Sequence, residues 1–535
     1  MISALGVICP ICGMNNCTMD HATTAGGKSV MIMGGIPLDV FVYGVVGVLL
    51  ISFVASTWLR PHVAAGFRLN LIKSKRLYKI VRNRWFQAIP QLLMVGILIA
   101  LIYIGLAGSR IANLTPVAVW TIWWAALIFA VLLLGTAWCF MCPWDGIANL
   151  VTRQRLASRS EPLTLGWEFP EWLKNVYPAI GLFIVLTWLE LGYGVTTNPR
   201  TTAYLGIGMV MLAVGSALMF RGKEFCQHLC PVGRICGIYS RFAPVEISNK
   251  RQRVCDKCKT EDCLNGNELG YACPTGVSLR TMTSTSECIG CTECIKSCRK
   301  QNVALNLRPF GSELRHVKLP KLDEAWLALA LLTLTFFHGI SMTPFWEDHR
   351  PGRDSILKWM GLHLGTSRVV NFTIAMAFAC VIPIAAYWLC CRLGARWARS
   401  GVSARKLFVT YAYSLLPVAL FYHLSHNLMH LGMEGGHIVP MLSDPMGNGS
   451  NYFGTKGMNM THLLSGEMLW FLQVGLILTG HIFGIVVAHR AALRTYQTKS
   501  AAVRSLIPML VLMIIISIGG LWLMHMDMNM RVGRM

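Results

Sequence analysis

The sequence predicts an all-α polytopic membrane protein of about ten transmembrane helices, interrupted by one inserted extramembrane domain. Of its 535 residues, 54% are hydrophobic and only 14% are charged, whereas a soluble protein carries about 25% charged residues. Apolar stretches long enough to cross a bilayer recur along the chain. The interval 222–324 contains no such stretch and holds most of the 19 cysteines, which marks it as a domain outside the membrane.

Ten stretches match a transmembrane helix, which needs about 20 apolar residues. They are residues 36–58, 87–107, 117–140, 176–194, 203–221, 325–346, 369–391, 407–430, 463–487 and 505–526. The chain then has four parts: an N-terminal segment at 1–35, a five-helix membrane domain at 36–221, the inserted domain at 222–324, and a second five-helix membrane domain at 325–535.

The basic residues predict how the chain sits in the membrane. The loop at 60–86 carries eight lysines or arginines and no acidic residue, and the positive-inside rule places such a loop in the cytoplasm. Counting helices from there puts the inserted domain in the cytoplasm, with both termini outside a prokaryotic cytoplasmic (inner) membrane. The formal charge of +23 fits basic cytoplasmic loops. No basic run is interleaved with aromatic residues as a nucleic-acid groove requires, so membrane lipid and not nucleic acid is the expected partner.

The cysteine spacing in the inserted domain predicts two [4Fe–4S] clusters in a ferredoxin-like domain. The run C-x2-C-x2-C-x3-C is the bacterial ferredoxin pattern, in which the fourth cysteine of each run ligates the other cluster. One expected ligand set is therefore Cys255, Cys258, Cys263 and Cys298, and the other is Cys273, Cys288, Cys291 and Cys294. A pair of structural zinc sites is the alternative, which this spacing disfavours.

Two cysteine pairs flank this domain and are candidates for a further redox site. CFMCPWD contains Cys139 and Cys142, and CQHLCPVGRIC contains Cys226 and Cys230. In each pair the second cysteine precedes a proline, and each pair is expected at the cytoplasmic end of a transmembrane helix. The alternative is that the proline ends the helix and the cysteine packs as a small apolar residue.

With these motifs, residues from about 36 to 310 resemble the membrane polyferredoxins of the NapH, NosR and CcoG type. The resemblance rests on Cys226, Cys230 and the run at 288–298, while the gap between Cys139 and Cys142 is two residues instead of three. It implies electron transfer between a quinol or a cytoplasmic donor and a partner across the membrane, often one that supports a periplasmic metalloenzyme. The five helices of the second membrane domain lie outside the resemblance.

The second membrane domain contains the stretch FYHLSHNLMHLGMEGGH, which places imidazoles along a transmembrane helix. His423, His426 and His430 follow at i, i+3 and i+7, a spacing that shares one helix face. Ionisable residues inside a membrane are costly and mark functional sites. We therefore predict metal ligands, with further candidates at His462, His525, His481 and His338.

Three interpretations of these histidines stay open. Imidazoles on facing helices are axial ligands of haem b. Imidazoles together with the neighbouring methionines suit copper. Histidine and methionine also pack between helices without any metal. At the N-terminus, Cys9, Cys12 and Cys17 are either ligands of a soft metal or disulfide partners.

Clusters on the cytoplasmic side and histidines on the outer side predict a transmembrane electron path. The leading hypothesis is an electron-transfer subunit that works with other redox subunits or an extracytoplasmic metalloprotein, without a soluble-substrate site of its own. Membrane quinone is a candidate participant, with Glu190 as acceptor of a quinol proton. The alternatives are copper handling, as a Cu(II) reductase or a transport or assembly protein, and a membrane anchor for a larger redox complex.

Overall fold

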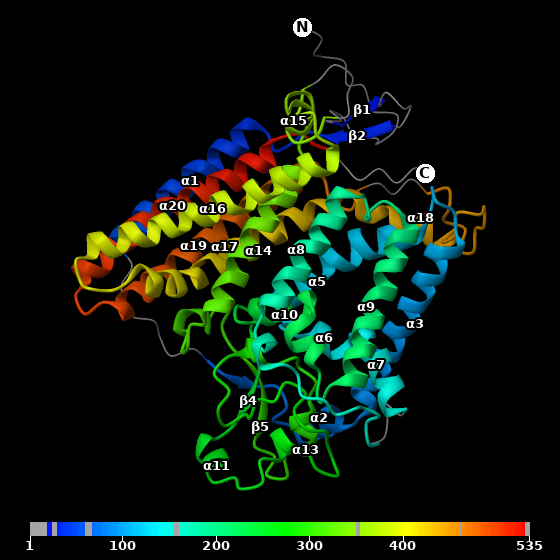
Figure 1. Ribbon diagram of the computed structural model, residues 1–535, viewed down its shortest axis with the longest axis vertical. Helices are drawn as coiled ribbons and strands as arrows, with labels where there is room; N and C mark the ends of the chain where they lie inside the picture. The colour runs from blue at the N-terminus through cyan, green and yellow to red at the C-terminus, as the bar shows by residue number, and fades with distance from the viewer. Residues whose placement is uncertain are drawn as a thin grey trace.

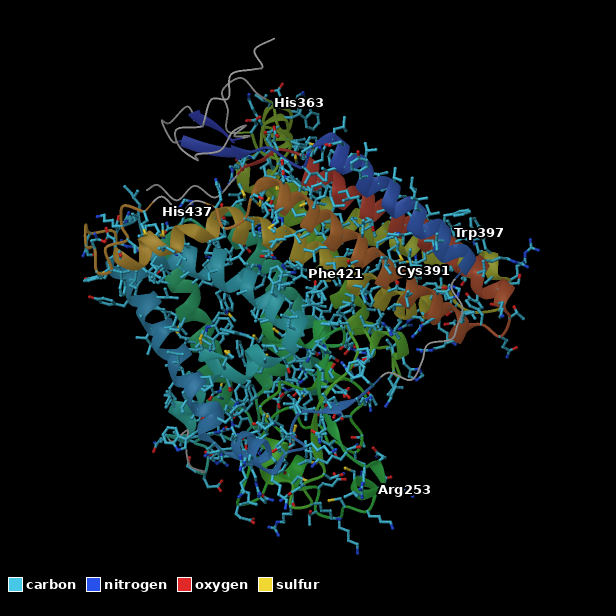
Figure 2. The ribbon with its side chains drawn as sticks, turned by 180° about the vertical axis from the view of Figure 1, so that it is seen from behind. Arg253, His363, Cys391, Trp397, Phe421 and His437 are labelled. Carbon is cyan, nitrogen blue, oxygen red and sulfur yellow. The ribbon has the colours of Figure 1, made fainter. Side chains whose placement is uncertain are left out.

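The computed structural model describes residues 19–23, 29–58, 67–154, 160–348, 354–458 and 462–529; Cys9, Cys12 and Cys17 lie outside these ranges. Long helices form the body of the molecule, and the segment at 222–324, here called the cysteine-rich domain, projects from one end of it (Figure 1). Figure 2 shows Arg253 at the tip of this domain, Phe421 in the middle of the helices and His363 at the opposite end.

Eight helical segments within the described ranges are long and apolar enough to cross a membrane. They are α3 (Trp85–Ala107), the continuous run α4–η1–α5 (Leu114–Leu134), α9 (Pro199–Met219), α14 (Leu322–Ser341), α16 (Arg368–Ala398), α17 (Ala404–Glu434) continued through α18 to Ser443, α19 (Gly466–Thr495) and α20 (Lys499–His525). Two further apolar helices, α1 (Leu38–Trp58) and α8 (Tyr177–Gly192), are shorter over their described side chains. Each of the ten predicted stretches therefore falls on a helix, and the prediction of a polytopic helical membrane protein is confirmed.

The last four long helices each begin at a hydroxyl cap. The side chains of Ser367, Ser403, Ser465 and Thr498 accept a hydrogen bond from the backbone N–H three residues further on. Such a cap satisfies one of the N–H groups that the first turn of a helix leaves without an internal partner. These caps set where each helix starts, and so fix which residues of α17 and α19 meet.

The helix α1 packs with α19 and α20, at the far end of the sequence. In Figure 1 the blue helix α1 runs beside the red helix α20. A Cβ added at Gly44 would lie 3.0 Å from Leu521 and 3.2 Å from Val474, so the backbones approach closely. Nearby, the strands β1 (Met19–Thr23), β2 (Ser29–Met33) and β6 (Met528–Asn529) form a sheet in the order β1-β2-β6. The sequence groups α1 with residues 36–221, but its packing partners lie in the second membrane domain.

The second membrane domain is built around α17, which has 89% of its most apolar stretch buried. Glycines of α19 let this helix approach: a Cβ at Gly480 would lie 2.7 Å from the Phe421 Cβ and 3.0 Å from the Pro417 carbonyl oxygen. Small residues that let two backbones approach are typical of helix pairs in membranes. This contact orients the face of α17 that carries the histidines.

Gly480→Leu is expected to force α17 and α19 apart, because the new side chain has no space against Phe421. Overpacking of this kind costs about 1–3 kcal/mol. The thermal unfolding midpoint of the purified protein should therefore fall. Gly475→Leu is the matched control, since Gly475 lies on the same helix with no atom within 4 Å of an added Cβ. Equal midpoints for the two variants would contradict the close contact.

The cysteine-rich domain is a small antiparallel sheet with short helices between its strands. β4 (Val245–Asn249) pairs with β5 (Val303–Leu307), so that Val245 lies opposite Leu307. β3 (Leu69–Asn70), from the basic loop after α1, adds to the other edge of β5. The cysteines lie on the connection from β4 to β5, which contains α11 (Gln252–Asp256), α12 (Asp262–Asn265) and α13 (Glu293–Ser297). These short strands are an addition to the predicted helices.

Buried ion pairs join the cysteine-rich domain to the membrane helices. Arg241 donates to the Glu324 carboxylate, at the start of α14, across 2.5 Å, and its other nitrogen lies 3.6 Å from Glu313. Arg308 lies 3.2 Å from Glu313 and 2.6 Å from Glu246 of β4. Burial acts to raise the pKa of Glu313, but the guanidinium groups of Arg241 and Arg308 outweigh it and hold that pKa below its usual value. The network therefore stays charged at neutral pH.

Candidate metal centres

The eight ferredoxin-type cysteines line two separate cavities of the cysteine-rich domain. A cavity of about 190 Å³ is lined by Cys255, Cys258, Cys263 and Cys298. A smaller one of about 30 Å³ is lined by Cys273, Cys288, Cys291 and Cys294. These groups are the two ligand sets that the spacing predicts. As predicted, Cys298 and Cys273, the last cysteines of their runs, each line the cavity of the other run. The structure brings the predicted partners together, and their loading with clusters stays a prediction.

The two sets differ in their surroundings. Burial raises the pKa of Cys288 to about 11 and that of Cys291 to about 12, so both thiols hold their protons at neutral pH until a metal displaces them. Partial burial also acts to raise the pKa of Cys258, but hydrogen bonds from Glu261 and Thr260 outweigh it and lower that pKa. The second set is therefore the drier of the two.

Hydrogen-bond donors point at several of these sulfurs. The Asn302 side-chain amide donates to Cys255 Sγ at 3.2 Å, and its backbone N–H donates to Cys298 Sγ at 3.4 Å. In the second set, the backbone N–H of Gly290 donates to Cys288 Sγ at 3.3 Å. Donors to ligand sulfur tune the reduction potential of iron–sulfur clusters. Both sets thus have the supporting hydrogen bonds that such a ligand needs.

The loop of the second set is anchored to the membrane helices. Lys296 is 1% exposed and donates to Glu293 at 2.7 Å and to Gln87 of α3 at 3.0 Å. Gly290 has a φ of +69°, and a Cβ there would lie 3.0 Å from Thr136 Oγ1. Only glycine adopts this backbone without strain and also leaves room for Thr136. The second set therefore lies directly against the helices, whereas the first faces outward.

The two flanking cysteine pairs lie at the starts of short helices. Cys139 lies on α6 (Ala137–Met141), while Cys142 and Cys230 cap α7 (Pro143–Arg153) and α10 (Pro231–Ser240) with proline as the first helical residue. Cys226 lies on the π-helical turn η3 (Phe225–Leu229). Proline is favoured at a first helical position because that N–H has no partner in the helix. Each proline therefore follows the end of one helical segment and starts the next, because Cys142 also ends α6 and Cys230 also ends η3.

Cys139, Cys142, Cys226 and Cys230, the cysteine quartet, lie close enough to perturb one another. Burial raises the pKa of Cys142, and Cys230 and Cys139 add to the effect. Burial likewise raises the pKa of Cys226, with contributions from Cys142 and Cys139. A further cysteine, the buried Cys236, forms a hydrogen bond with Cys139. The sequence left open whether the two pairs converge, and the structure brings them together.

A row of aromatic rings leads from the cysteine quartet towards α17. Trp138, next to Cys139, has its ring centre 5.2 Å from that of Trp123. Trp123 lies 5.9 Å from Trp124, and Trp124 lies 6.1 Å from His423. The row therefore connects the cysteine end of the bundle with the histidine-bearing helix through ring contacts.

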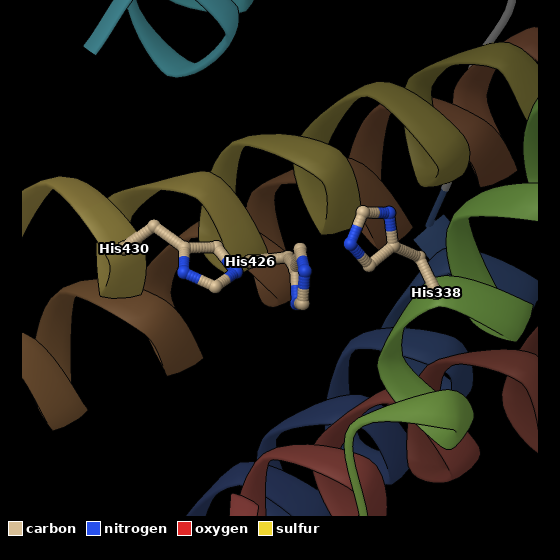
Figure 3. Close-up of side chains that lie close together, drawn as sticks. All are labelled: His338, His426 and His430. Atoms are coloured by element: carbon tan, nitrogen blue, oxygen red, sulfur yellow. The ribbon is translucent and has the colours of Figure 1, made fainter. Parts of the chain in front are cut away.

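Three histidines from two helices lie close together and form the histidine triad, with the His426 ring between those of His430 and His338 (Figure 3). His338 of α14 faces His426 and His430 of α17, and ligand nitrogens of the three lie within 4.8 Å of one another. Carboxylates support two of them: Glu434 Oε2 lies 3.1 Å from His430 Nδ1, and Glu190 Oε1 lies 3.9 Å from His338 Nε2. A carboxylate behind a histidine is the common support of a metal ligand. The triad has the composition of a site for one ion.

His423 and His462 lie away from the triad. His423 shares its helix face with His430, but seven residues of helix span about 10 Å, too far for one ion. Its ring faces Trp124 at 6.1 Å and Tyr239 at 6.3 Å. His462 interacts with His437 near the end of α17. The third member of the triad is instead His338, which the sequence offers only as a separate candidate.

His481 and His525 are engaged in helix packing. The two ring nitrogens of His481 lie 2.8 Å from Ser52 Oγ and 2.9 Å from Ser517 Oγ, between α1 and α20. His525 Nδ1 lies 2.6 Å from the Ile36 carbonyl oxygen. These contacts are those of the packing interpretation, in which histidine forms hydrogen bonds across helices. They tie α1 to the last two helices.

Several residues near the sites were not predicted from the sequence. Asp145 is 6% exposed and lies 2.5 Å from Lys223 beside the quartet. Cys236 belongs to the stretch CQHLCPVGRIC, yet no cysteine motif in the sequence pairs it with another cysteine. Trp123 and Trp138 share no periodicity, although the cluster WTIWW was a visible signal. Each of these contacts joins different segments of the chain, so no local sequence pattern predicts it.

The fold and these sites define a polytopic helical membrane protein whose cysteine-rich domain carries cysteines in the ferredoxin pattern. No protein-family model matches the chain, and no solved structure matches it. Curated proteins with similar sequences, however, give a consistent indication of its class.

Over 242 residues the chain is 26% identical to an uncharacterized protein of Methanocaldococcus jannaschii, a match that covers 44% of this chain and 89% of that protein. Over 144 residues it is 28% identical to the methylamine utilization ferredoxin-type protein MauN of Paracoccus denitrificans, covering 24% of this chain and 48% of MauN. Over 94 residues it is 27% identical to YccM of Escherichia coli, provisionally named an electron transport protein, covering 17% and 23%. Parts of the chain are thus similar to ferredoxin-type electron transport proteins, in agreement with the expected polyferredoxin class in its broad sense.

Proposed function

We propose that this protein is an electron-transfer subunit of a prokaryotic cytoplasmic membrane. It links iron–sulfur clusters in a cytoplasmic cysteine-rich domain with a metal centre nearer the opposite face. The observation that carries this proposal is the grouping of eight cysteines into two cavities that reproduce the ferredoxin ligand sets. The similarity to MauN and YccM supports the same class. The proposed partners are other redox subunits and an extracytoplasmic redox protein.

The donor sets of the two cavities fit iron–sulfur clusters. Each set offers four thiols and no competing imidazole, and a bound [4Fe–4S] cluster supplies one-electron transfer. The N–H groups of Asn302 and Gly290 donate to sulfur and stabilise thiolate charge. Lys296 ties the second set to α3. These residues hold the second set where it adjoins the membrane helices.

The residues between the ferredoxin-type cysteines and the histidines of α17 favour a continuous path for electrons. Cys139 of the quartet contributes to the raised pKa of Cys288, so the quartet adjoins the second ferredoxin set. Four converging thiols suit a further metal or cluster site. From there the rings of Trp138, Trp123 and Trp124 lead to His423. These rings shorten the longest distance that an electron must cross without a carrier, which lies in the middle of the membrane.

The histidine triad fits one metal ion better than haem b. Haem with two histidine ligands uses one on each face of the ring, whereas His338, His426 and His430 bring three ligand nitrogens within 4.8 Å of one another. Imidazole binds copper, iron and zinc well. A redox-active ion, with copper as the first candidate, therefore best matches the triad. This geometry also favours copper handling as a second candidate function.

His426→Ala is expected to lower the triad's metal content from about one ion per chain to near zero, because two imidazoles bind a divalent ion weakly. Glu434→Gln, which alters the carboxylate behind His430, should weaken metal binding about 10–100-fold. Metal analysis of protein purified after copper or iron supplementation measures both. His363→Ala, at an exposed histidine of α15 (Ile356–Leu364), is the matched control. Equal metal content in His426→Ala and His363→Ala would contradict the site.

Electron flow across a membrane tests the proposed function directly. Protein purified without oxygen is reconstituted into liposomes that contain ferricyanide, and dithionite is added outside. Ferricyanide bleaching well above that of protein-free liposomes is expected, with loss of flow in Cys291→Ser. Protein that contains iron and sulfide but gives no flow above the blank would overturn the proposal. Unchanged flow in His426→Ala would instead favour the anchor function for the second membrane domain.

A further inference from the structure

Three arginines from two segments of the chain meet where α19 ends. Arg490 and Arg494 lie about one turn apart in the last part of α19, and Arg315 lies on η5 (Leu314–His316), near the end of the cysteine-rich domain. Arg494 donates a hydrogen bond to the Arg315 carbonyl oxygen. Arg490 lies close enough to Arg315 and Arg494 for the three charges to interact. These residues are here called the arginine cluster.

The arginine cluster lacks an acidic counterpart within the described part of the chain. None of its three members forms an ion pair with a described carboxylate. Glu313 lies only two residues before Arg315, but it is bound by Arg241 and Arg308 instead. The Nε–H of Arg315 is buried and has no acceptor among the described residues. The cluster therefore offers positive charge and hydrogen-bond donors that the fold itself does not use.

Further positive charge lies beside the cluster. The Arg494 guanidinium holds the pKa of His316 below its usual value, and burial and the Lys318 ammonium act in the same direction. Like charges held this close repel one another, and a buried N–H without an acceptor destabilises the folded protein. An anion with several acceptor oxygens removes both costs. A phosphate group suits the cluster best, because the planar fork of a guanidinium matches two phosphate oxygens at once.

The surroundings of the cluster indicate the phosphate of a membrane lipid. Arg490 and Arg494 belong to a helix that is long and apolar enough to cross a membrane. Ile482 lies about two turns before Arg490 on this helix and is exposed. Leu319, four residues after Arg315, is exposed as well. Exposed apolar side chains beside a group of cations match the acyl chains and the head group of an anionic phospholipid.

We propose that the arginine cluster binds the head-group phosphate of an anionic phospholipid, in the leaflet beside the cysteine-rich domain. The three guanidinium groups donate to the phosphate oxygens, and the acyl chains lie against Ile482 and Leu319. The lipid thereby joins η5 to α19, next to the place where an added Cβ on Gly311 would lie 3.5 Å from Phe483. It strengthens the contact between the cysteine-rich domain and the second membrane domain. The inference is independent of the proposed electron transfer, because it uses none of the candidate metal ligands.

Lipid titration of the delipidated full-length protein in detergent, followed by native mass spectrometry, tests the site. Phosphatidylglycerol should bind at least about tenfold more tightly than phosphatidylcholine with the same acyl chains, because the choline cation is repelled by the cluster. Arg490→Gln combined with Arg494→Gln should weaken the tightest phosphatidylglycerol binding at least about tenfold, through lost charge-assisted hydrogen bonds. Should this double variant fail to yield monodisperse protein, Arg494→Gln alone replaces an exposed side chain and should weaken binding in the same direction.

Arg392→Gln combined with Arg396→Gln is the matched control. These two arginines have the same spacing near the C-terminal end of α16 as Arg490 and Arg494 have near that of α19. The control therefore removes the same charge from the end of another membrane helix. Its affinity for phosphatidylglycerol should stay within about twofold of the wild type, because scattered surface charges are screened by salt. Equal losses in the two double variants would show diffuse attraction and overturn the proposed site.

Thermal unfolding separates a bound lipid from a dissolved anion. Phosphatidylglycerol should raise the unfolding midpoint of the wild type, because a ligand that binds only the folded protein stabilises it. The rise should be smaller in the variant of Arg490 and Arg494. Inorganic phosphate at the same ionic strength should leave the midpoint unchanged, and an equal rise with it would overturn the lipid assignment. Equal binding of phosphatidylglycerol and phosphatidylcholine would identify a site for acyl chains alone and would also overturn the proposal.

Discussion

Cys298→Ser should remove about four of the irons bound per chain and leave the other ferredoxin-type cluster in place. In sequence Cys298 ends the run that contains Cys288 and Cys291, yet in the structure it lines the cavity of Cys255, Cys258 and Cys263. The cluster lost should therefore be the one nearer the surface. Iron and sulfide analysis, with electron paramagnetic resonance of the reduced protein, measures the loss and identifies the surviving species.

The converse variant and a matched control make this result decisive. Cys273→Ser should remove the buried cluster, because Cys273 lines the cavity of the second set. Cys390→Ser, at a half-buried cysteine of α16, should retain full iron content. If Cys298→Ser abolished the same resonance signal as Cys291→Ser, the exchange of ligands between the two runs would be wrong.

Arg241→Met should destabilise the protein by about 3–5 kcal/mol, the usual effect of breaking a buried ion pair. Arg241 and Glu324 are each 2% exposed, and the substitution leaves the Glu324 and Glu313 carboxylates without their shared cation. Tyr413 and Ser286 still donate to Glu324 at 2.7 and 2.8 Å, but neutral donors do not cancel its charge. The thermal unfolding midpoint in detergent should fall clearly below that of the wild type.

Arg299→Met is the matched control for a surface ion pair. Arg299 lies 2.9 Å from Glu268, with the two side chains 59% and 64% exposed. Such pairs contribute about 0–1 kcal/mol, so this variant should unfold close to the wild-type temperature. Shifts of equal size in Arg241→Met and Arg299→Met would show that burial does not set the strength of the Arg241 pair.

The helices and the cysteine sets were predictable because both follow from local patterns. A membrane helix must be apolar over its whole length, and cluster ligands recur at fixed spacing. Spacing alone assigned Cys298 to the ligand set of the other cysteine run, and likewise Cys273. The structure groups both cysteines in that way.

The sites between helices could not be predicted, because contacts across helices depend on packing and leave no spacing in the chain. His338 joins His426 through the contact of α14 with α17, and Trp138 meets Trp123 across a break in the helix. The sequence identified Pro143 and Pro231 as special but not as helix starts. Helical segments lie on both sides of each proline, and proline suits the first helical position because the N–H that it lacks has no partner there.

The packing of α1 against α19 and α20 links the order of biosynthesis to the order of assembly. A ribosome completes α1 hundreds of residues before α20, so the Gly44 face of α1 has no partner until translation is nearly finished. A chain divided after residue 324 would separate α1 from the helices that complete it. A division between α1 and α3 would also separate α1 from α19 and α20, but it would keep α3 to α20 together on one polypeptide, with the buried Arg241–Glu324 pair intact. The protein should therefore tolerate expression as two fragments cut at the second position far better than at the first.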